Sequence, residues 1–120
     1  MVLEMARSGE DLDGVVSFHG ALATESPAKA GMVKSKVLVL TGAADPMIPI
    51  EQVRAFETEM QGAGIDHRII SYPDAKHAFT NRAADSAAQK FGIPVAYNEH
   101  ADTSSWKELS GFLSSLYRKN

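Results

Sequence analysis

Two polar residues follow strand-like segments in an order that suits acid–base chemistry. Asp45 comes soon after the Val/Leu run at residues 37–40, and His77 follows a second apolar segment at residues 67–72. On loops that follow parallel strands, a carboxylate can orient an imidazole, and the imidazole can move protons to and from a nucleophile. We therefore interpret Asp45 and His77 as the last two members of a nucleophile, acid and histidine triad.

The sequence contains no candidate for the nucleophile of such a triad. No Gly-x-Ser-x-Gly or Gly-x-Cys-x-Gly pattern occurs, and the chain has no cysteine to provide a thiolate. Ser8, Ser17, Ser26 and Ser35 lack the strand, turn and helix that would expose a nucleophile. We expect the nucleophile elbow to lie just before Met1, which would make this chain the C-terminal half of a larger enzyme.

Each of these residues also has a simpler interpretation. Asp45 precedes Pro46 and could only open a turn, because its side chain can bond nearby backbone amides. His77 could be a solvated loop histidine. His19, after the first strand-like segment, lies at the same predicted edge, but we favour a histidine bonded to local backbone and leave it outside the triad. A metal site built from His19, Asp45 and His77 matches no known ligand spacing, so no metal is predicted.

Apolar periodicity predicts alternating strands and helices. Short apolar runs predict strands, and a segment with apolar residues at helical spacing lies between the second and third of them; the ranges are 14–20, 36–41 and 67–72 for the strands and 50–62 for the helix. Crossovers between parallel strands are right-handed in nearly all cases, which brings Asp45 and His77 to one edge of the sheet.

Further helices are predicted towards both ends of the chain. Residues 1–8 resemble the tail of a helix, and residues 83–90 suggest a short one. A final helix should run from Asp102 or Thr103, as its cap, to about Tyr117. Its apolar stripe should pack on the sheet, and two basic residues suit its C-terminal dipole; the stripe is Trp106, Leu109, Leu113 and Leu116, and the basic residues are Arg118 and Lys119.

Composition limits the classes of function. With 120 residues, of which 44% are hydrophobic, the chain can bury one core, so residues 1–120 are predicted to form a single partial domain. A net charge of -3 offers no basic stripe for nucleic acid. No apolar run reaches the about 18 residues that a membrane helix needs, so no membrane partner is expected.

Three segments in order resemble the dienelactone hydrolase family. They are residues 41–49 followed by an amphipathic helix, residues 72–81 around His77, and residues 95–98 before a Trp-bearing final helix; residues 15–20 are similar to the strand after the family's nucleophile helix. The resemblance covers essentially the whole chain. It implies the C-terminal part of an α/β-hydrolase fold, with about three parallel strands and flanking helices, and a Cys(Ser)-His-Asp triad to which this chain supplies Asp45 and His77.

The resemblance also implies the partners and the compartment. The substrate would be a small ester or lactone, no cofactor would be needed, and the enzyme would be cytoplasmic. Some family members hold a substrate carboxylate with an arginine four positions after the histidine, where this chain has Asn81, with Arg82 adjacent. The long segment 79–101 is an ordinary surface excursion or the wall of a substrate pocket. In the second case its candidate contacts are Phe79, Asn81, Arg82 and Tyr97.

Three functions stay open at this point. The first is the acid–base half of an esterase or lactonase, inactive in isolation because nucleophile and oxyanion hole are missing. The second is a non-catalytic binding or assembly module that completes a partner's sheet, and the third is a remnant without activity. Because a sheet cut from a larger one leaves an unpaired edge, we expect a homo-oligomer or domain swap.

Overall fold

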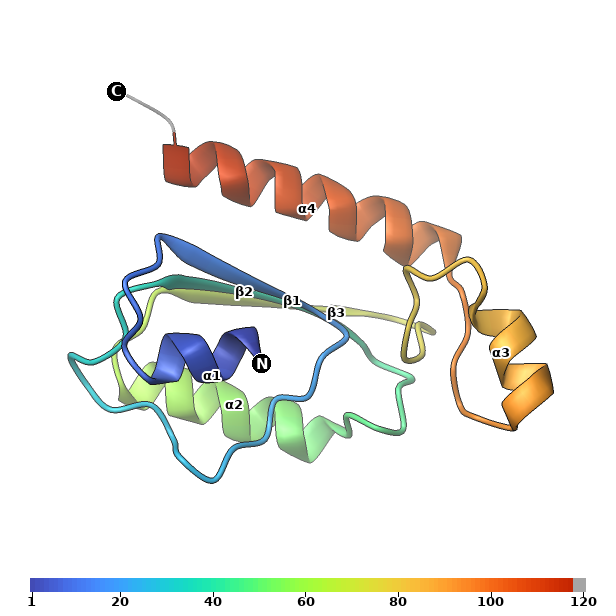
Figure 1. Ribbon diagram of the computed structural model, residues 1–120, viewed down its shortest axis with the longest axis horizontal. Coiled ribbons are helices and arrows are strands. Elements are labelled where there is room, and N and C mark those ends of the chain that lie inside the picture. The colour runs from blue at the N-terminus through green and yellow to red at the C-terminus, as the bar shows by residue number, and fades with distance from the viewer. Residues whose placement is uncertain (118–120) are drawn as a thin grey trace.

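The computed structural model, which describes residues 1–117, has a parallel three-stranded sheet with helices on both faces (Figure 1). Its strands are β1 (Gly14–Phe18), β2 (Lys36–Gly42) and β3 (His67–Tyr72), in the spatial order β1-β2-β3. The predicted α/β fold class, with three parallel strands and flanking helices, is confirmed.

The central strand is apolar because both of its faces are covered. Val37, Leu38, Val39 and Leu40 are each at most 2% exposed, as expected of a parallel strand buried on both sides. β1 ends at Phe18 rather than continuing to residue 20 as predicted. The reason is local, since the next residue turns the chain into the left-handed region with φ of 43° while its amide still bonds the carbonyl of Leu40.

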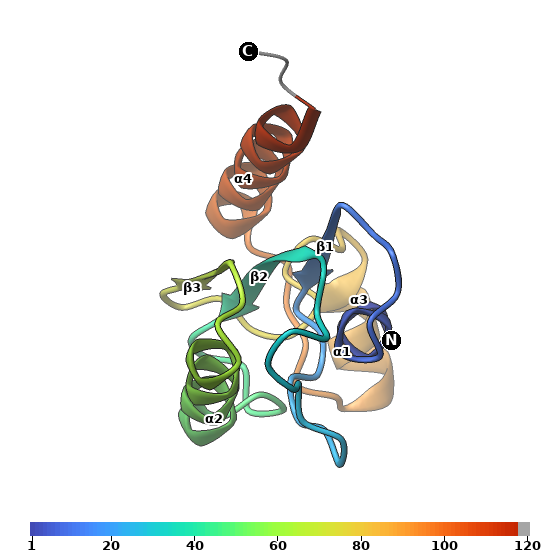
Figure 2. The ribbon, with the colours of Figure 1, turned by 90° about the vertical axis from the view of Figure 1, so that its left-hand side faces the viewer.

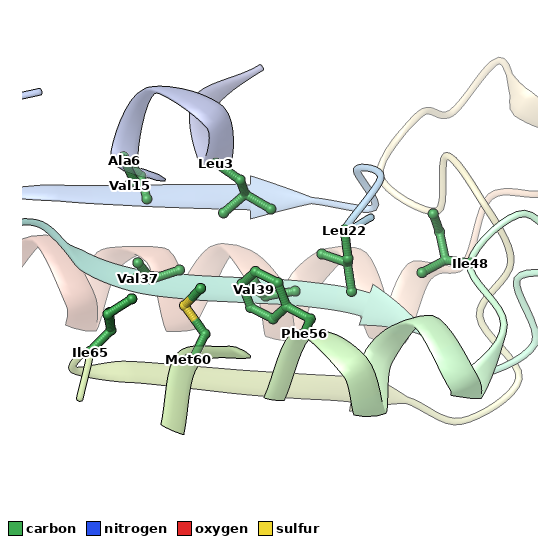
Figure 3. Packing of buried hydrophobic residues seen from close by; sticks show 10 residues of the cluster. All are labelled: Leu3, Ala6, Val15, Leu22, Val37, Val39, Ile48, Phe56, Met60 and Ile65. Atoms are coloured by element: carbon green, nitrogen blue, oxygen red, sulfur yellow. The ribbon is translucent and has the colours of Figure 1, made fainter. Parts of the chain in front are cut away.

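Helices α1 (Val2–Arg7) and α2 (Ile50–Gly62) cover one face of the sheet (Figures 1 and 2). Side chains from both helices meet those of β1 and β2 in one cluster (Figure 3), whose buried members are Leu3, Ala6, Val15, Leu22, Val37, Val39, Ile48, Phe56, Met60 and Ile65. Each large aliphatic or aromatic side chain removed from water contributes about 1.5–3 kcal/mol, so this cluster fixes the helices on the sheet.

A buried arginine ties this layer together. The Arg7 guanidinium bonds both carboxylate oxygens of Glu59 at 2.7 and 2.8 Å, contacts Glu4, and donates to the carbonyl of Leu22 at 2.8 Å. Burial alone would lower the pKa of Arg7, but its hydrogen bonds and charge interactions with the two glutamates outweigh burial and raise it. The segment that follows β1 is thereby held against α1 and α2.

The final helix, α4 (Glu99–Tyr117), covers the opposite face of the sheet (Figure 2). The predicted start at Asp102 or Thr103 is wrong. Asn98 precedes the helix and caps it, because its side-chain oxygen accepts a hydrogen bond from the amide of Ala101 at 2.9 Å. Asp102 lies inside the helix and is buried.

The predicted apolar stripe of α4 packs on the sheet only in part. Trp106 and Leu113 are 54% and 43% exposed, although the Trp106 ring lies 5.1 Å from that of Phe18 on β1. Phe112 and Leu116 do approach the sheet, where Gly14 leaves room for them: a Cβ on this glycine would lie 2.7–2.9 Å from both side chains. Part of the apolar face of α4 thus has no strand of the three-stranded sheet against it. Arg118 and Lys119 lie outside the described residues.

The short helix α3 (Ala84–Phe91) lies beyond the carboxyl ends of the strands (Figure 1). Gly92 ends it in the left-handed conformation, with φ of 63°. No helix within residues 1–117 is both long and apolar enough to cross a membrane.

Candidate active site

The loops that follow β2 and β3 touch at the carboxyl edge of the sheet. The amide of Ala43 donates to the carbonyl of Tyr72 at 2.9 Å, and the amide of Ala44 donates to the carbonyl of Ala75 at 3.0 Å. This approach requires a glycine, because a Cβ on Gly42 would lie only 2.3 Å from the Ala75 carbonyl oxygen. The contact brings the two sequence-predicted polar residues together.

Asp45 and His77 form a hydrogen-bonded pair. Nδ1 of His77 lies 2.9 Å from Oδ2 of Asp45, while Oδ1 of Asp45 accepts the amide of Met47 at 2.8 Å. The Asp45 side chain is fully buried and that of His77 is 26% exposed. A buried carboxylate therefore holds a partly exposed imidazole through Nδ1. The other ring nitrogen, Nε2, is left for proton transfer. Asp45 also makes the predicted turn, since one carboxylate oxygen accepts the Met47 amide and the other binds the histidine.

The chain on the other side of His77 is held by the segment before α4. His77 and Val95 form an isolated parallel bridge, and the amide of Ala96 donates to the carbonyl of His77 at 3.2 Å. The amide of Asn98 donates to the carbonyl of Phe79 at 3.1 Å. The long segment after His77 thus doubles back along the histidine loop and fixes its backbone.

His19 and Thr80 also lie beside this pair. Nε2 of His19 is 3.0 Å from Oγ1 of Thr80, and the His19 ring centroid is 5.4 Å from that of His77 and 5.1 Å from that of Phe79. The predicted bond to local backbone is not the only interaction of His19, because its ring also bonds a side chain 61 positions away. Its predicted placement at the same edge as Asp45 and His77 agrees with the structure.

The four predicted substrate contacts lie on or beside the histidine loop. Phe79 has no exposed surface and packs against the rings of His19 and Tyr72. Asn81 is exposed and accepts the amide of Ala83 before α3, and the Arg82 guanidinium lies 6.0 Å from the Tyr97 ring. The Tyr97 hydroxyl donates to Asp102 at 2.7 Å, and this hydrogen bond raises the pKa of Tyr97. Substrate contact by these residues stays a prediction.

Backbone strain gathers at the same edge. Among the described residues, three that are not glycine have positive φ: His19 at 43°, Asp74 at 62° and Ala78 at 63°. Such conformations cost of order 1–3 kcal/mol each and persist where the surrounding structure imposes them. All three lie in the loops that carry or contact His77, which is where a functional site would hold strain.

A hollow of about 380 Å³ occurs at the opposite edge of the sheet, under α4. Its charged residues pair with one another, since Lys36 lies 3.8 Å from Asp66 and Arg68 lies 2.8 Å from Glu108. It lies at the opposite ends of the strands from the acid–histidine pair, and its one histidine, His67, is bonded to Ile65 and Glu57. Within residues 1–117, no three histidine, aspartate or glutamate side chains converge to hold a metal ion.

This geometry suits one kind of chemistry. An imidazole oriented through Nδ1 by a buried carboxylate can accept a proton from a hydroxyl or thiol and return it to a leaving group. Such an arrangement serves acyl transfer when a nucleophile and oxyanion donors face Nε2.

Comparison with known proteins gives a consistent result. The family model described as the dienelactone hydrolase family matches residues 1–117. A dienelactone hydrolase-like promiscuous phosphotriesterase from metagenomic libraries is 36% identical over 95% of this chain, with a TM-score of 0.85. The structure named m3DLH is 33% identical over 97% of the chain, with a TM-score of 0.86. No curated protein matches.

A more distant structure agrees in fold. A putative dienelactone hydrolase from Klebsiella pneumoniae is 24% identical over 89% of this chain and 45% of its own, with a TM-score of 0.69. The chain spans slightly less than half the length of the two closer structures above, 46% of the first and 47% of the second.

Proposed function

The chain belongs to the dienelactone hydrolase family, and we propose that it supplies the acid and the base of a carboxylic ester or lactone hydrolase site. The observation that carries this proposal is the hydrogen bond between the fully buried Asp45 carboxylate and Nδ1 of His77, at 2.9 Å. In this proposal Asp45 orients His77 and stabilises its protonated form, and His77 is the general base and then the general acid.

The proposed reaction is acyl transfer in two steps. A hydroxyl or thiol gives its proton to Nε2 of His77 as its oxygen or sulfur bonds the substrate's carbonyl carbon. The tetrahedral intermediate then collapses, the bond to the leaving alkoxide breaks, and the imidazolium returns the proton to that oxygen. Water repeats the sequence on the acyl intermediate and releases the acid. The proton moves between the nucleophile, His77 and the leaving group, and Asp45 does not take it up.

This proposal requires groups from outside the sequence. The chain has no cysteine and no serine on an elbow motif, so the nucleophile and the oxyanion donors would come from the other half of the family fold. In such an assembly the substrate would lie between that half and the histidine loop. A cytoplasmic location belongs to the same proposal.

The direct test is to supply the missing half. Residues 1–120 would be fused behind the part of the 36% identical phosphotriesterase that they do not match, and hydrolysis of p-nitrophenyl acetate would be followed. We expect turnover by the fusion, and a loss of about 10³-fold or more in His77→Ala, the scale seen when a triad member is removed. Asp45→Asn should lose a comparable factor, because the histidine then adopts the wrong tautomer.

His67 provides the matched control for this experiment. It is a half-buried histidine at the opposite end of β3, where it bonds Ile65 and Glu57. His67→Ala should leave kcat/KM of the fusion within a factor of a few. A folded fusion whose turnover does not depend on His77 would refute the proposed role.

A second substrate class is favoured by the comparison. The 36% identical structure is described as a promiscuous phosphotriesterase, and the acid–histidine pair would serve a nucleophile at phosphorus as well as at a carbonyl carbon. We propose an aryl phosphotriester as the second substrate for the fusion. Hydrolysis of both substrates should fall together in His77→Ala; phosphotriester turnover that survives this change would exclude a shared site.

A further inference from the structure

His19 lies where it can control the geometry of the acid–histidine pair. It follows β1, whereas Asp45 follows β2 and His77 follows β3, so three adjacent strands each send one side chain to this edge. The amide of His19 donates to the carbonyl of Leu40 at 2.8 Å, which anchors its backbone to the central strand. The backbone of His19 is therefore anchored to the sheet independently of the histidine loop.

The side chain of His19 contacts that loop at two points. Its Nε2 shares a hydrogen bond with Oγ1 of Thr80 at 3.0 Å, and its ring meets that of His77 edge-on, at 5.4 Å between centroids and 67° between planes. Beneath it lies the Phe79 ring, 5.1 Å away and fully buried. His19 thus braces both the loop backbone after His77 and the His77 ring itself.

The local conformation shows that this placement is imposed. The φ of 43° at His19 is unfavourable for a residue with a Cβ, and Ala78, next to His77, has φ of 63°. Burial, followed by the nearby His77, lowers the pKa of His19, and the Asp45 carboxylate opposes this only in part. A neutral imidazole can sit beside His77 without adding a second positive charge when His77 is protonated.

From these contacts we propose that His19 is a positioning residue of the Asp45–His77 pair, acting through its hydrogen bond to Thr80 and its contact with the His77 ring. This proposal rests on the proposed function, because the pair is what His19 positions. Without this brace, the loop and ring of His77 gain freedom, and the hydrogen bond from Nδ1–H to Asp45 competes with other orientations.

The test reads which nitrogen of His77 carries the proton. In the ¹⁵N-labelled chain, at a pH where its histidines are neutral, long-range ¹H–¹⁵N correlation distinguishes the Nδ1–H from the Nε2–H form. We expect Nδ1–H to dominate in wild type. His19→Phe keeps an aromatic ring but loses the hydrogen bond to Thr80, and Thr80→Val loses the same bond. In both variants the ratio of the Nδ1–H form to the Nε2–H form of His77 should fall about fivefold, the factor that one neutral hydrogen bond represents.

Conservative and remote changes make the result specific. His19→Gln keeps a polar group near the position of Nε2 and should restore most of the wild-type ratio, whereas His67→Gln should not change it. Ratios are compared for variants whose backbone amide spectra match wild type away from residues 77–81. A wild-type ratio in both folded His19→Phe and Thr80→Val would overturn the positioning role.

One further variant separates this proposal from the proposed function. Asp45→Asn can keep one oxygen for the Met47 amide and present an NH2 donor to Nδ1 of His77 in place of the carboxylate oxygen, so it should abolish the Nδ1–H preference. If Asp45→Asn has no effect, the acid–histidine pair is wrong. If Asp45→Asn abolishes the preference while His19→Phe and Thr80→Val keep it, the pair stands and only the role of His19 fails.

Discussion

Gly42 is the position at which a single methyl group should separate the acid from the histidine. A Cβ built there lies 2.3 Å from the carbonyl oxygen of Ala75 and 2.8 Å from its carbonyl carbon. Both atoms belong to the backbone, so no side-chain rotation relieves the contact. In Gly42→Ala the Ala75 backbone must retreat by about 1 Å to reach ordinary van der Waals separation.

The cost follows from what this retreat breaks. Forcing an extra methyl group into packed surroundings costs about 1–3 kcal/mol. Weakening the bond from the Ala44 amide to the Ala75 carbonyl, 3.0 Å long, adds about 1 kcal/mol. We therefore expect the free energy of unfolding to fall by about 2–4 kcal/mol. The displaced loop leads directly to His77, so the hydrogen bond between His77 and Asp45 should lengthen as well.

The assay is urea unfolding followed by circular dichroism, with Gly111→Ala as the matched control. Gly111 lies inside α4, and a Cβ there would meet nothing within 4 Å. Removing a glycine from a helix interior should stabilise the chain by about 1 kcal/mol. The reasoning is refuted if Gly42→Ala unfolds within about 0.5 kcal/mol of wild type, the usual range for a change without special contacts.

Three further predictions concern the isolated chain. It should hydrolyse p-nitrophenyl acetate negligibly, and turnover that disappears in His77→Ala would contradict this by requiring a nucleophile already present. Because β1 pairs only with β2 among the described strands and Trp106 is 54% exposed, light scattering at micromolar concentration should show a dimer or larger assembly; a compact monomer would count against it. Burial works to lower the pKa of His67, but its bonds to the Ile65 carbonyl and Glu57 raise it. A raised pKa stabilises the folded state below about pH 6.5, and that stability is lost as pH rises through the folded value. The stability lost in His67→Gln should therefore be larger at pH 6 than at pH 8, a trend that urea unfolding would measure and that an equal loss at both values would contradict.

Local sequence patterns predicted much of the framework. The helix at residues 50–62 and the strand at residues 67–72 agree with α2 and β3 at both ends. Their limits are marked by residues with strong conformational preferences, such as Pro49 before the helix and Pro73 after the strand. The order of strands then required Asp45 and His77 to share an edge, and the structure brings their side chains into contact.

Contacts between distant segments could not be predicted in this way. Asn98 caps α4 because the segment before it is bonded to the histidine loop, so the start of that helix depends on tertiary structure. His19, which leaves β1 with positive φ, bonds the Thr80 side chain in the loop that follows β3, and a contact over this sequence separation is not visible in a local pattern. The burial of the apolar stripe on α4 was overestimated, because periodicity shows which residues are apolar but not how far the sheet extends beneath them.

The most direct test of the proposed acid–base role is the pair of fusion proteins with and without His77. Both would carry the part of the 36% identical relative that this chain does not match ahead of residues 1–120, and both would be checked for the same folded circular dichroism spectrum. Hydrolysis of p-nitrophenyl acetate by the wild-type fusion, with a loss of about 10³-fold or more in His77→Ala, is the result predicted. Equal hydrolysis by the two folded fusions would contradict it.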